Sequence, residues 1–200
     1  METLQKRTDT PRGVRVARWV FFCLALGICI FIFMNSAANA EESGGESLAV
    51  TELIARGFVK DFADLPAEEQ GRILDGLHGY VRTAAHFSEY AALGFFVMLF
   101  LLSFGKEFCP DPAGRWRRYL TGYGFCVLYA MSDEIHQLFV DGRVADAGDV
   151  AIDSLGALAG CLGACFCGWL VFVFIRRFRR RHSVHGCASR KNQRLSEENT

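Results

Sequence analysis

The 200-residue chain lacks an excess of charge of either sign, because 22 Lys and Arg residues balance 22 Asp and Glu residues. A nucleic-acid-binding domain usually carries an excess of basic charge, so this balance disfavours that class. Charge is also absent from long stretches, although 22% of the residues are charged. A soluble enzyme or a secreted disulfide scaffold would not confine its charges to short blocks between apolar runs. The sequence therefore predicts an integral membrane protein.

Four apolar runs are long enough to cross a membrane as helices. A hydrocarbon core of about 30 Å requires roughly 20 helical residues. The runs cover residues 19–38, 84–104, 119–140 and 150–175, the last two with acidic residues near one end. The sequence predicts an all-α, polytopic membrane protein with four transmembrane helices in a domain over 19–175. Basic tails over 1–18 and 176–200 flank it, and the second is expected to be disordered.

Basic residues set the expected orientation, because Lys and Arg are retained on the cytoplasmic side of a membrane. The two tails and the segment between the second and third runs hold 17 of the 22 basic residues. Both termini are therefore expected in the cytoplasm. The basic start, the first run and Ala38-Asn39-Ala40 also fit a cleavable signal peptide. The length of the run favours an uncleaved anchor, and cleavage would leave three helices in the same orientation.

The extracytoplasmic connection between the first two helices covers residues 41–81. Apolar residues recur at helical spacing in two stretches of this segment, Val50 to Phe62 and Ile73 to Val81. The second stretch follows Pro66 and has Glu68 and Glu69 in its first turn, which is typical of a helix start. Two amphipathic helices, lying on the membrane or on the bundle, are expected here.

None of the eight cysteines falls in the expected outer segments, so no external disulfide is expected. Cys161, Cys165 and Cys167 lack the paired C-x-x-C spacing of a zinc site and lie within a predicted membrane helix, which favours a packing role. Gly156 and Gly160 begin a face of small residues that lets a neighbouring helix approach closely. Such a face could also support a helix-mediated oligomer.

Polar side chains gather near one end of each of the last three runs. They are His86, Glu89 and Tyr90 in the second run, Asp133, Glu134, His136 and Gln137 in the third, Asp149 and Asp153 in the fourth, and Arg143 in the loop before it. Ionisable groups within membrane helices are costly and by default mark function. Helical spacing places most members of each set on one face.

These side chains also share one depth in the outer third of the bilayer. Glu89 lies about 7–8 Å, and Asp133 about 10 Å, from the outer end of its helix. A packing network is the alternative explanation for any single residue, but the common depth favours a site. We expect catalytic roles for His86, Glu89, Asp133, Glu134, His136, Arg143 and Asp153, and substrate binding by Tyr90, Gln137 and Asp149. So many carboxyl groups must be protonated, paired or bound to a cation, which leaves room for a divalent cation.

Three motifs carry a resemblance to a known family. Residues 85–94 resemble the H-F-x-E-Y-x-x-L-G motif of the VanZ-like family of bacterial integral membrane proteins. Residues 132–143 are similar to its D-E-x-H-Q-x-F-x-x-x-R signature, and residues 149–160 to its D-x-x-x-D-x-x-G-x-x-x-G motif. The resemblance covers about residues 82–168. Asp141 departs from it, since proline is frequent there in the family.

The resemblance implies a place in the bacterial cytoplasmic membrane and a link to envelope antibiotics, since the family is named after a protein associated with teicoplanin resistance. It does not imply a reaction. One hypothesis is an enzyme acting on a lipid-linked cell-wall precursor, with Arg143 holding phosphate or carboxylate oxygens and a His and an acid exchanging protons. The alternatives are a non-enzymatic factor that binds an envelope component or membrane lipid, and an ion or proton relay. No cofactor is established by these motifs.

Overall fold

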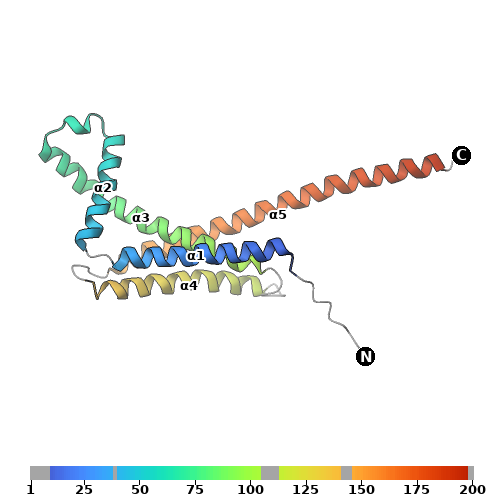
Figure 1. The fold of residues 1–200 in the computed structure, drawn as a ribbon, viewed down its shortest axis with the longest axis horizontal. Coiled ribbons are helices and arrows are strands. Elements are labelled where there is room, and N and C mark those ends of the chain that lie inside the picture. The colour runs from blue at the N-terminus through green and yellow to red at the C-terminus, as the bar shows by residue number, and fades with distance from the viewer. Residues whose placement is uncertain (1–9, 38–39, 105–112, 141–145, 198–200) are drawn as a thin grey trace, which may run out of the picture. The chain divides into compact units, whose positions relative to one another are not determined.

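The computed structural model describes residues 10–37, 40–104, 113–140 and 146–197. Within these ranges the chain forms helices and no strand: α1 (Arg12–Ala37), α2 (Ala40–Phe58), the short 3-10 helix η1 (Phe62–Asp64), α3 (Ala67–Ser103), α4 (Ala113–Gln137) and α5 (Ala147–Glu197) (Figure 1). The predicted all-α class is confirmed. The chain divides into two units after Ala164, so that α5 begins in the first unit and continues in the second.

Three of the described helices are long and apolar enough to cross a membrane: Arg12–Ala37, Ala67–Ser103 and Ala147–Phe174. They contain the predicted spans over 19–38, 84–104 and 150–175, in each case all but the last residue. The third predicted span corresponds to α4, whose 25 residues would extend for about 37 Å. Its Tyr, Gly and acidic residues leave α4 less apolar than the other three helices, so its crossing of the membrane stays a prediction.

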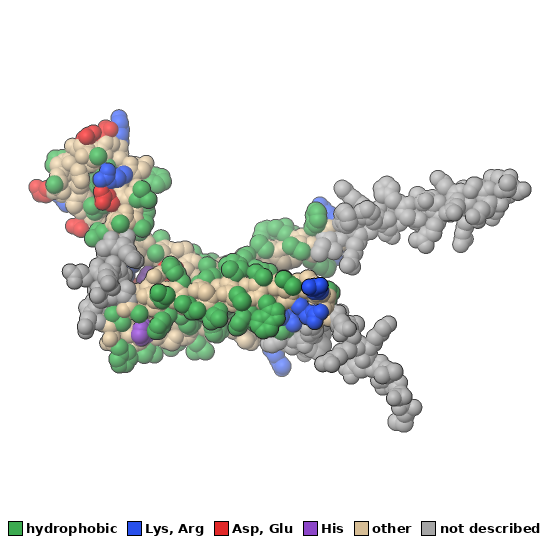
Figure 2. Space-filling model, in the orientation of Figure 1, with side chains coloured by type: hydrophobic (Ala, Val, Ile, Leu, Met, Phe, Trp, Pro, Cys, Tyr) green, Lys and Arg blue, Asp and Glu red, His purple; other side chains and the backbone are tan. Residues whose placement is uncertain are grey.

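The outer surface of the first unit carries many large apolar side chains. In α1 only Ala25, Ile32 and Ser36 are buried, and Trp19, Phe31 and Met34 are all more than half exposed. Figure 2 shows this apolar surface extending along the bundle. An apolar surface of this size is unfavourable in water but is well solvated by lipid tails.

The second span and the preceding amphipathic helix form one continuous helix, α3. The sequence placed a boundary between residues 81 and 84, but no Gly or Pro occurs between Gly79 and Gly94 to interrupt the helix. The 37 residues of α3 extend for about 55 Å, whereas about 20 helical residues cross the hydrocarbon core. The N-terminal half of α3 therefore extends beyond the length that a membrane requires.

The N-terminal half of α3 pairs with α2 and η1 in a helical hairpin (Figure 1). Asp61 adopts a left-handed backbone conformation with φ of 54° between α2 and η1, which reverses the chain direction. Thr51 and Ala55 of α2 and Phe62 of η1 are buried in the hairpin, whereas Phe58 is almost fully exposed. The two amphipathic stretches are thus helical, but Phe58 does not join the buried side.

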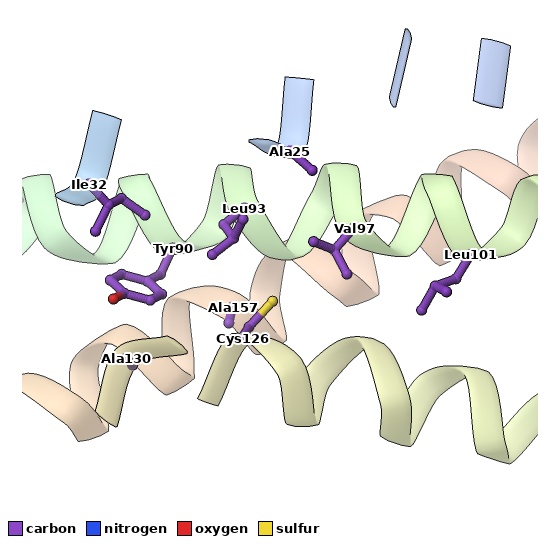
Figure 3. Close-up of a cluster of buried hydrophobic side chains, with 9 residues drawn as sticks. All are labelled: Ala25, Ile32, Tyr90, Leu93, Val97, Leu101, Cys126, Ala130 and Ala157. Atoms are coloured by element: carbon purple, nitrogen blue, oxygen red, sulfur yellow. The ribbon is translucent and has the colours of Figure 1, made fainter. Parts of the chain in front are cut away.

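The core of the first unit lies where α1, α3, α4 and the start of α5 meet. It contains Ala25, Ile32, Tyr90, Leu93, Val97, Leu101, Cys126, Ala130 and Ala157 (Figure 3). A methyl group added at Gly156 would collide with the carbonyl of Phe87, and one at Gly160 with the carbonyl of Ala91. The prediction that Gly156 and Gly160 allow close helix approach is confirmed, and their partner is α3.

The second unit is the continuation of α5 from Cys165 to Glu197. Its first turns expose Trp169, Phe172 and Phe174, as expected for a lipid-facing helix. The sequence predicted a disordered tail over 176–200, but helix continues to Glu197. This stretch contains no Pro and one Gly, and it is rich in Arg, which has a favourable helix propensity.

Candidate functional site

Side chains from four helices form a group that we call the polar cluster. Its members are Asn35 and Ser36 of α1, His86, Glu89 and Tyr90 of α3, Asp133, Glu134 and Gln137 of α4, and Asp153 of α5. The structure thus brings together seven of the ten residues predicted for the site. Asp149 lies at the edge of the cluster, and the ring of His136 stacks on α1 outside it. Arg143 lies outside the described residues.

His86 and Asp153 form a polar contact between α3 and α5. The Nδ1 atom of His86 lies 3.6 Å from Oδ1 of Asp153, a distance suited to an ion pair but long for a hydrogen bond. Asp153 is fully buried. It lies one helical turn before Gly156, on the face that approaches α3 most closely. The glycine contact therefore explains why Asp153 faces His86 in the bundle interior.

Glu89 is held by α1, because the Nδ2 group of Asn35 donates a hydrogen bond of 3.0 Å to its Oε1 atom. Ser36 is buried beside Asn35 and lies next to the carboxyl group of Asp133. The sequence did not assign either residue of α1 to the site. The available signal was two adjacent polar residues near the C-terminal end of an otherwise apolar run.

Glu134 links α4 to the start of α5. Its Oε2 atom accepts a hydrogen bond of 2.9 Å from the backbone nitrogen of Asp146. Asp146 in turn caps α5, since its Oδ1 atom accepts a 2.7 Å hydrogen bond from the backbone nitrogen of Gly148. One oxygen of Glu134 therefore has a structural partner, while Oε1 has none among the described residues.

Arg82 and Asp149 form the more exposed edge of the cluster. The Nη2 atom of Arg82 lies 3.4 Å from Oδ2 of Asp149, and these side chains are 45% and 23% exposed. Among the described residues, the basic partner of Asp149 is therefore Arg82, which the sequence did not assign to the site. The signal for Arg82 was its position one turn before His86 on the same helix.

His136 follows a different arrangement from its neighbours on α4. Its ring stacks on Phe33 of α1, with ring centroids 4.8 Å apart. It is only partly buried, and its Nε2 atom has no hydrogen-bond partner among the described residues. The shared helical face with Asp133 places it near the cluster, but its observed contact is aromatic.

Several buried polar atoms of the cluster have no hydrogen-bond partner within the described part of the chain. They include the hydroxyl of Tyr90, both amide atoms of Gln137 and both carboxyl oxygens of Asp153. Tyr90 extends from α3 toward α4 (Figure 3), and it and Asp153 are 0% exposed while Gln137 is 1% exposed. Leaving a buried polar group unpaired costs about 1–3 kcal/mol, so this arrangement is a departure from ordinary packing.

The polar cluster lies in a part of the sequence that matches a known protein family. The model of the family described as VanZ/LLP1 matches residues 20–175, which include every residue of the polar cluster. The chain belongs to the VanZ/LLP1 family. The curated proteins and the solved structures contain no significant match to it. The resemblance read from the three motifs is thereby confirmed, and the polar cluster lies within the region that defines this VanZ/LLP1 protein.

The six described cysteines of this VanZ/LLP1 chain lie apart from the polar cluster. No disulfide forms among the six described cysteines. Cys126 and Cys161 pack together between α4 and α5, and the thiol of Cys161 contacts the carbonyl oxygen of Gly94 at 3.5 Å. Within the described ranges, no group of three or more His, Cys, Asp or Glu side chains is close enough to hold a metal ion.

Proposed function

We propose that the chain crosses the bacterial cytoplasmic membrane four times, with α4 as the third span and both termini in the cytoplasm. Arg18 near the start of α1 donates a 3.2 Å hydrogen bond to the carbonyl of Ser103 at the end of α3. Asn35 near the end of α1 reaches Glu89 of α3. These contacts make α1 and α3 antiparallel, and the basic end of α1 is visible in Figure 2.

The ends of α4 support its role as a span. The helix follows Phe104 in the sequence, and Gly122 packs against Met98 and Leu101 near the end of α3. Its other end contacts the start of α5 through Glu134. Arg82 of α3 contacts the same part of α5 through Asp149. The helix thus covers the same stretch as the spanning half of α3, in the opposite direction. Burial of its less apolar face against α1 and α3 reduces the polar surface left for lipid.

The polar cluster is our candidate for the functional centre of this envelope protein, and its role is to bind or act on a lipid-linked cell-wall precursor. The observation that carries this proposal is the convergence of buried polar atoms from Tyr90, Gln137 and Asp153 that have no hydrogen-bond partner among the described residues. Their cost to folding is offset if a ligand supplies the missing partners. A position in the outer half of the bundle suits a ligand that carries its polar group on the outer leaflet.

The cluster also has groups suited to proton transfer. An imidazole oriented by a carboxyl group is a common general acid or base, and His86 beside Asp153 has this arrangement. If the reaction uses a divalent cation, the ligand would have to supply part of its coordination, because no three acidic, His or Cys side chains among the described residues lie close enough to hold one. Arg143 stays a proposed ligand for phosphate or carboxylate oxygens. Whether the protein turns its ligand over or only binds it is decided by measuring products.

An ion or proton relay is less well supported. A relay requires polar groups along the whole membrane thickness, whereas apolar Leu93, Val97 and Leu101 follow the cluster along α3 toward its C-terminal end (Figure 3). A link to teicoplanin-type resistance is part of the proposal through the family. It predicts that expression of the chain in a susceptible bacterium raises the teicoplanin concentration needed to stop growth.

The decisive experiment measures binding and turnover of lipid-linked cell-wall precursors by the purified full-length protein. We expect Glu89→Gln, Asp133→Asn and Asp153→Asn to lower binding or turnover at least tenfold while membrane abundance stays near that of the wild type. The matched control is Asp75→Asn, an exposed acid of α3 outside the cluster. Unchanged binding and turnover in all three variants would refute the proposed site.

If the cluster were only a packing network, the same substitutions would reduce abundance. Removing one partner of a buried ion pair costs about 3–5 kcal/mol, and the protein would then fail to accumulate. Membrane abundance measured beside binding therefore separates a functional site from a purely structural network. His136→Ala and Arg143→Ala test two further residues that the sequence predicted for the site.

A further inference from the structure

The polar cluster differs from the whole chain in its charge balance. It contains four acidic side chains, Glu89, Asp133, Glu134 and Asp153, and one basic candidate, His86, which already faces Asp153. At the edge of the cluster, Arg82 is paired with Asp149. An anionic group entering the cluster would therefore meet several carboxyl groups, and the described basic side chains would first have to leave acidic partners.

A cationic group would meet a more favourable arrangement. Both oxygens of Asp153, Oε1 of Glu134 and Oε1 of Gln137 are buried acceptors without hydrogen-bond partners among the described residues. A primary ammonium group provides one positive charge and three N–H donors, so it can satisfy up to three such acceptors. Hydrogen bonds of this charge-assisted kind are about twice as strong as neutral ones.

Aromatic side chains add to this preference. Tyr90 is fully buried, and its ring centroid lies 6.4 Å from that of Tyr129. Aromatic faces attract cations through the ring quadrupole, and the effect grows where water is excluded. The Tyr90 hydroxyl lies among the same buried polar side chains as Asp133 and Asp153 and has no hydrogen-bond partner among the described residues. The Tyr90 hydroxyl therefore belongs to the same polar cluster as these acceptors.

We propose that the polar cluster recognises a primary ammonium group on its ligand, with Asp153, Glu134 and Gln137 as acceptors. This inference rests on the proposed function, because it concerns the same site and names the group that is bound. The ammonium group can come from the headgroup of an aminophospholipid or from the free amino group of the peptide on a lipid-linked precursor. Both sources supply the same chemistry.

The test compares ligands that differ only in their amine. Purified full-length protein is titrated with phosphatidylethanolamine and its N-acetyl derivative, and with a lipid-linked peptide precursor before and after N-acetylation. EDTA is present throughout, so that divalent cations do not contribute. We expect at least one amine to bind at least tenfold more tightly than its acetylated form, and the tighter of the two amines identifies the source.

Variants connect the preference to the cluster. Asp153→Asn and Gln137→Leu are expected to remove most of the preference for the free amine, while the control Asp75→Asn retains it. A preference that persists in both cluster variants would overturn the assignment. If a variant does not fold, the comparison between amine and acetylated ligand in the wild-type protein still decides whether an ammonium group is recognised.

The outcomes separate this inference from the proposed function. Equal binding of free and acetylated precursor, lost in Asp153→Asn, would overturn ammonium recognition and leave the precursor site intact. Binding that appears only when Mg²⁺ replaces EDTA would make the cluster a metal site and overturn the inference. Binding of phosphatidylethanolamine with no binding of any precursor would support ammonium recognition and refute the proposed precursor. No binding of any of these ligands would refute both.

Discussion

At the residue scale, the polar side chains inside the bundle, buried or partly buried, fall into two groups with different consequences. Tyr129 donates a 2.6 Å hydrogen bond to the backbone carbonyl of Cys29. Glu134 accepts a hydrogen bond from the backbone nitrogen of Asp146 at the start of α5. Tyr90 and Gln137 are buried as deeply or more deeply, but their polar atoms lack partners among the described residues. The first group contributes to folding, whereas the second costs stability in the free protein, as our proposal of a ligand site requires.

Tyr90 and Tyr129 provide a matched pair for testing this division. Tyr90→Phe removes a hydroxyl without a partner, so we expect unchanged or raised stability in the free protein and weaker ligand binding. Tyr129→Phe removes an established hydrogen bond, and we expect a loss of about 1 kcal/mol. Thermal unfolding of the purified variants in detergent measures both effects. A loss of stability in Tyr90→Phe equal to that in Tyr129→Phe would contradict the division.

Glu134 allows the structural and functional roles of one residue to be separated. Glu134→Gln retains an oxygen that can accept the hydrogen bond from the backbone of Asp146, so the protein should accumulate normally while ligand binding falls. Glu134→Ala removes that acceptor and should cost about 1–2 kcal/mol of stability. Membrane abundance and ligand binding, measured for both variants, test this expectation. Equal abundance of the two variants would show that the Glu134–Asp146 bond does not matter.

At the scale of elements, the contact between α3 and α5 determines how the site is assembled. Gly156, Gly160 and Gly94 each lie against backbone of the opposing helix. This close approach brings Asp153 next to His86, one turn away from Gly156. Spacing on a single helix predicts the small-residue face of α5, but it does not identify the partner. The three-dimensional structure supplies that information.

Gly160→Ala tests this contact directly. The added methyl group would overlap the carbonyl oxygen of Ala91, so we expect overpacking to cost about 1–3 kcal/mol. Gly124 of α4 has open space around its Cβ position, and Gly124→Ala should be neutral or stabilise the helix by up to about 1 kcal/mol. Thermal unfolding compares the two. Equal stability of Gly160→Ala and the wild type would mean that α3 and α5 can separate without cost.

The elements also show what the sequence predicted and what it did not. The apolar runs predicted the helices because about 20 uncharged residues in succession have few alternatives. The continuity of α3 was missed because a change from amphipathic to apolar composition looks like a boundary, although nothing interrupts the backbone hydrogen bonds. Asn35 and Arg82 were missed as partners of Glu89 and Asp149, because contacts between helices depend on their rotation and depth. Seven of the nine members of the cluster were predicted, and the pairs within it were not.

At the scale of the whole molecule, the path of α4 determines on which side the chain ends. If α1, α3 and α5 alone crossed the membrane, an N-terminus in the cytoplasm would place the end of α5 outside. If α4 also crosses, the end of α5 returns to the cytoplasm. The location of Arg177, near the end of the apolar part of α5, therefore distinguishes four spans from three.

This prediction can be tested with single cysteines in a variant without native cysteines. Such a variant should fold, because the described cysteines form no disulfide and lie apart from the polar cluster. We expect Asp75→Cys to react with a membrane-impermeant maleimide in intact cells that lack an outer-membrane barrier. Arg12→Cys and Arg177→Cys should react only after lysis. Each position lies in a basic tail of the chain, and basic residues favour the cytoplasmic side. Labelling of Arg177→Cys but not Arg12→Cys in intact cells would establish three spans. It would also place α4 on one face of the membrane, where Asp133 and Glu134 could no longer meet His86 and Asp153 in the outer half of the bundle.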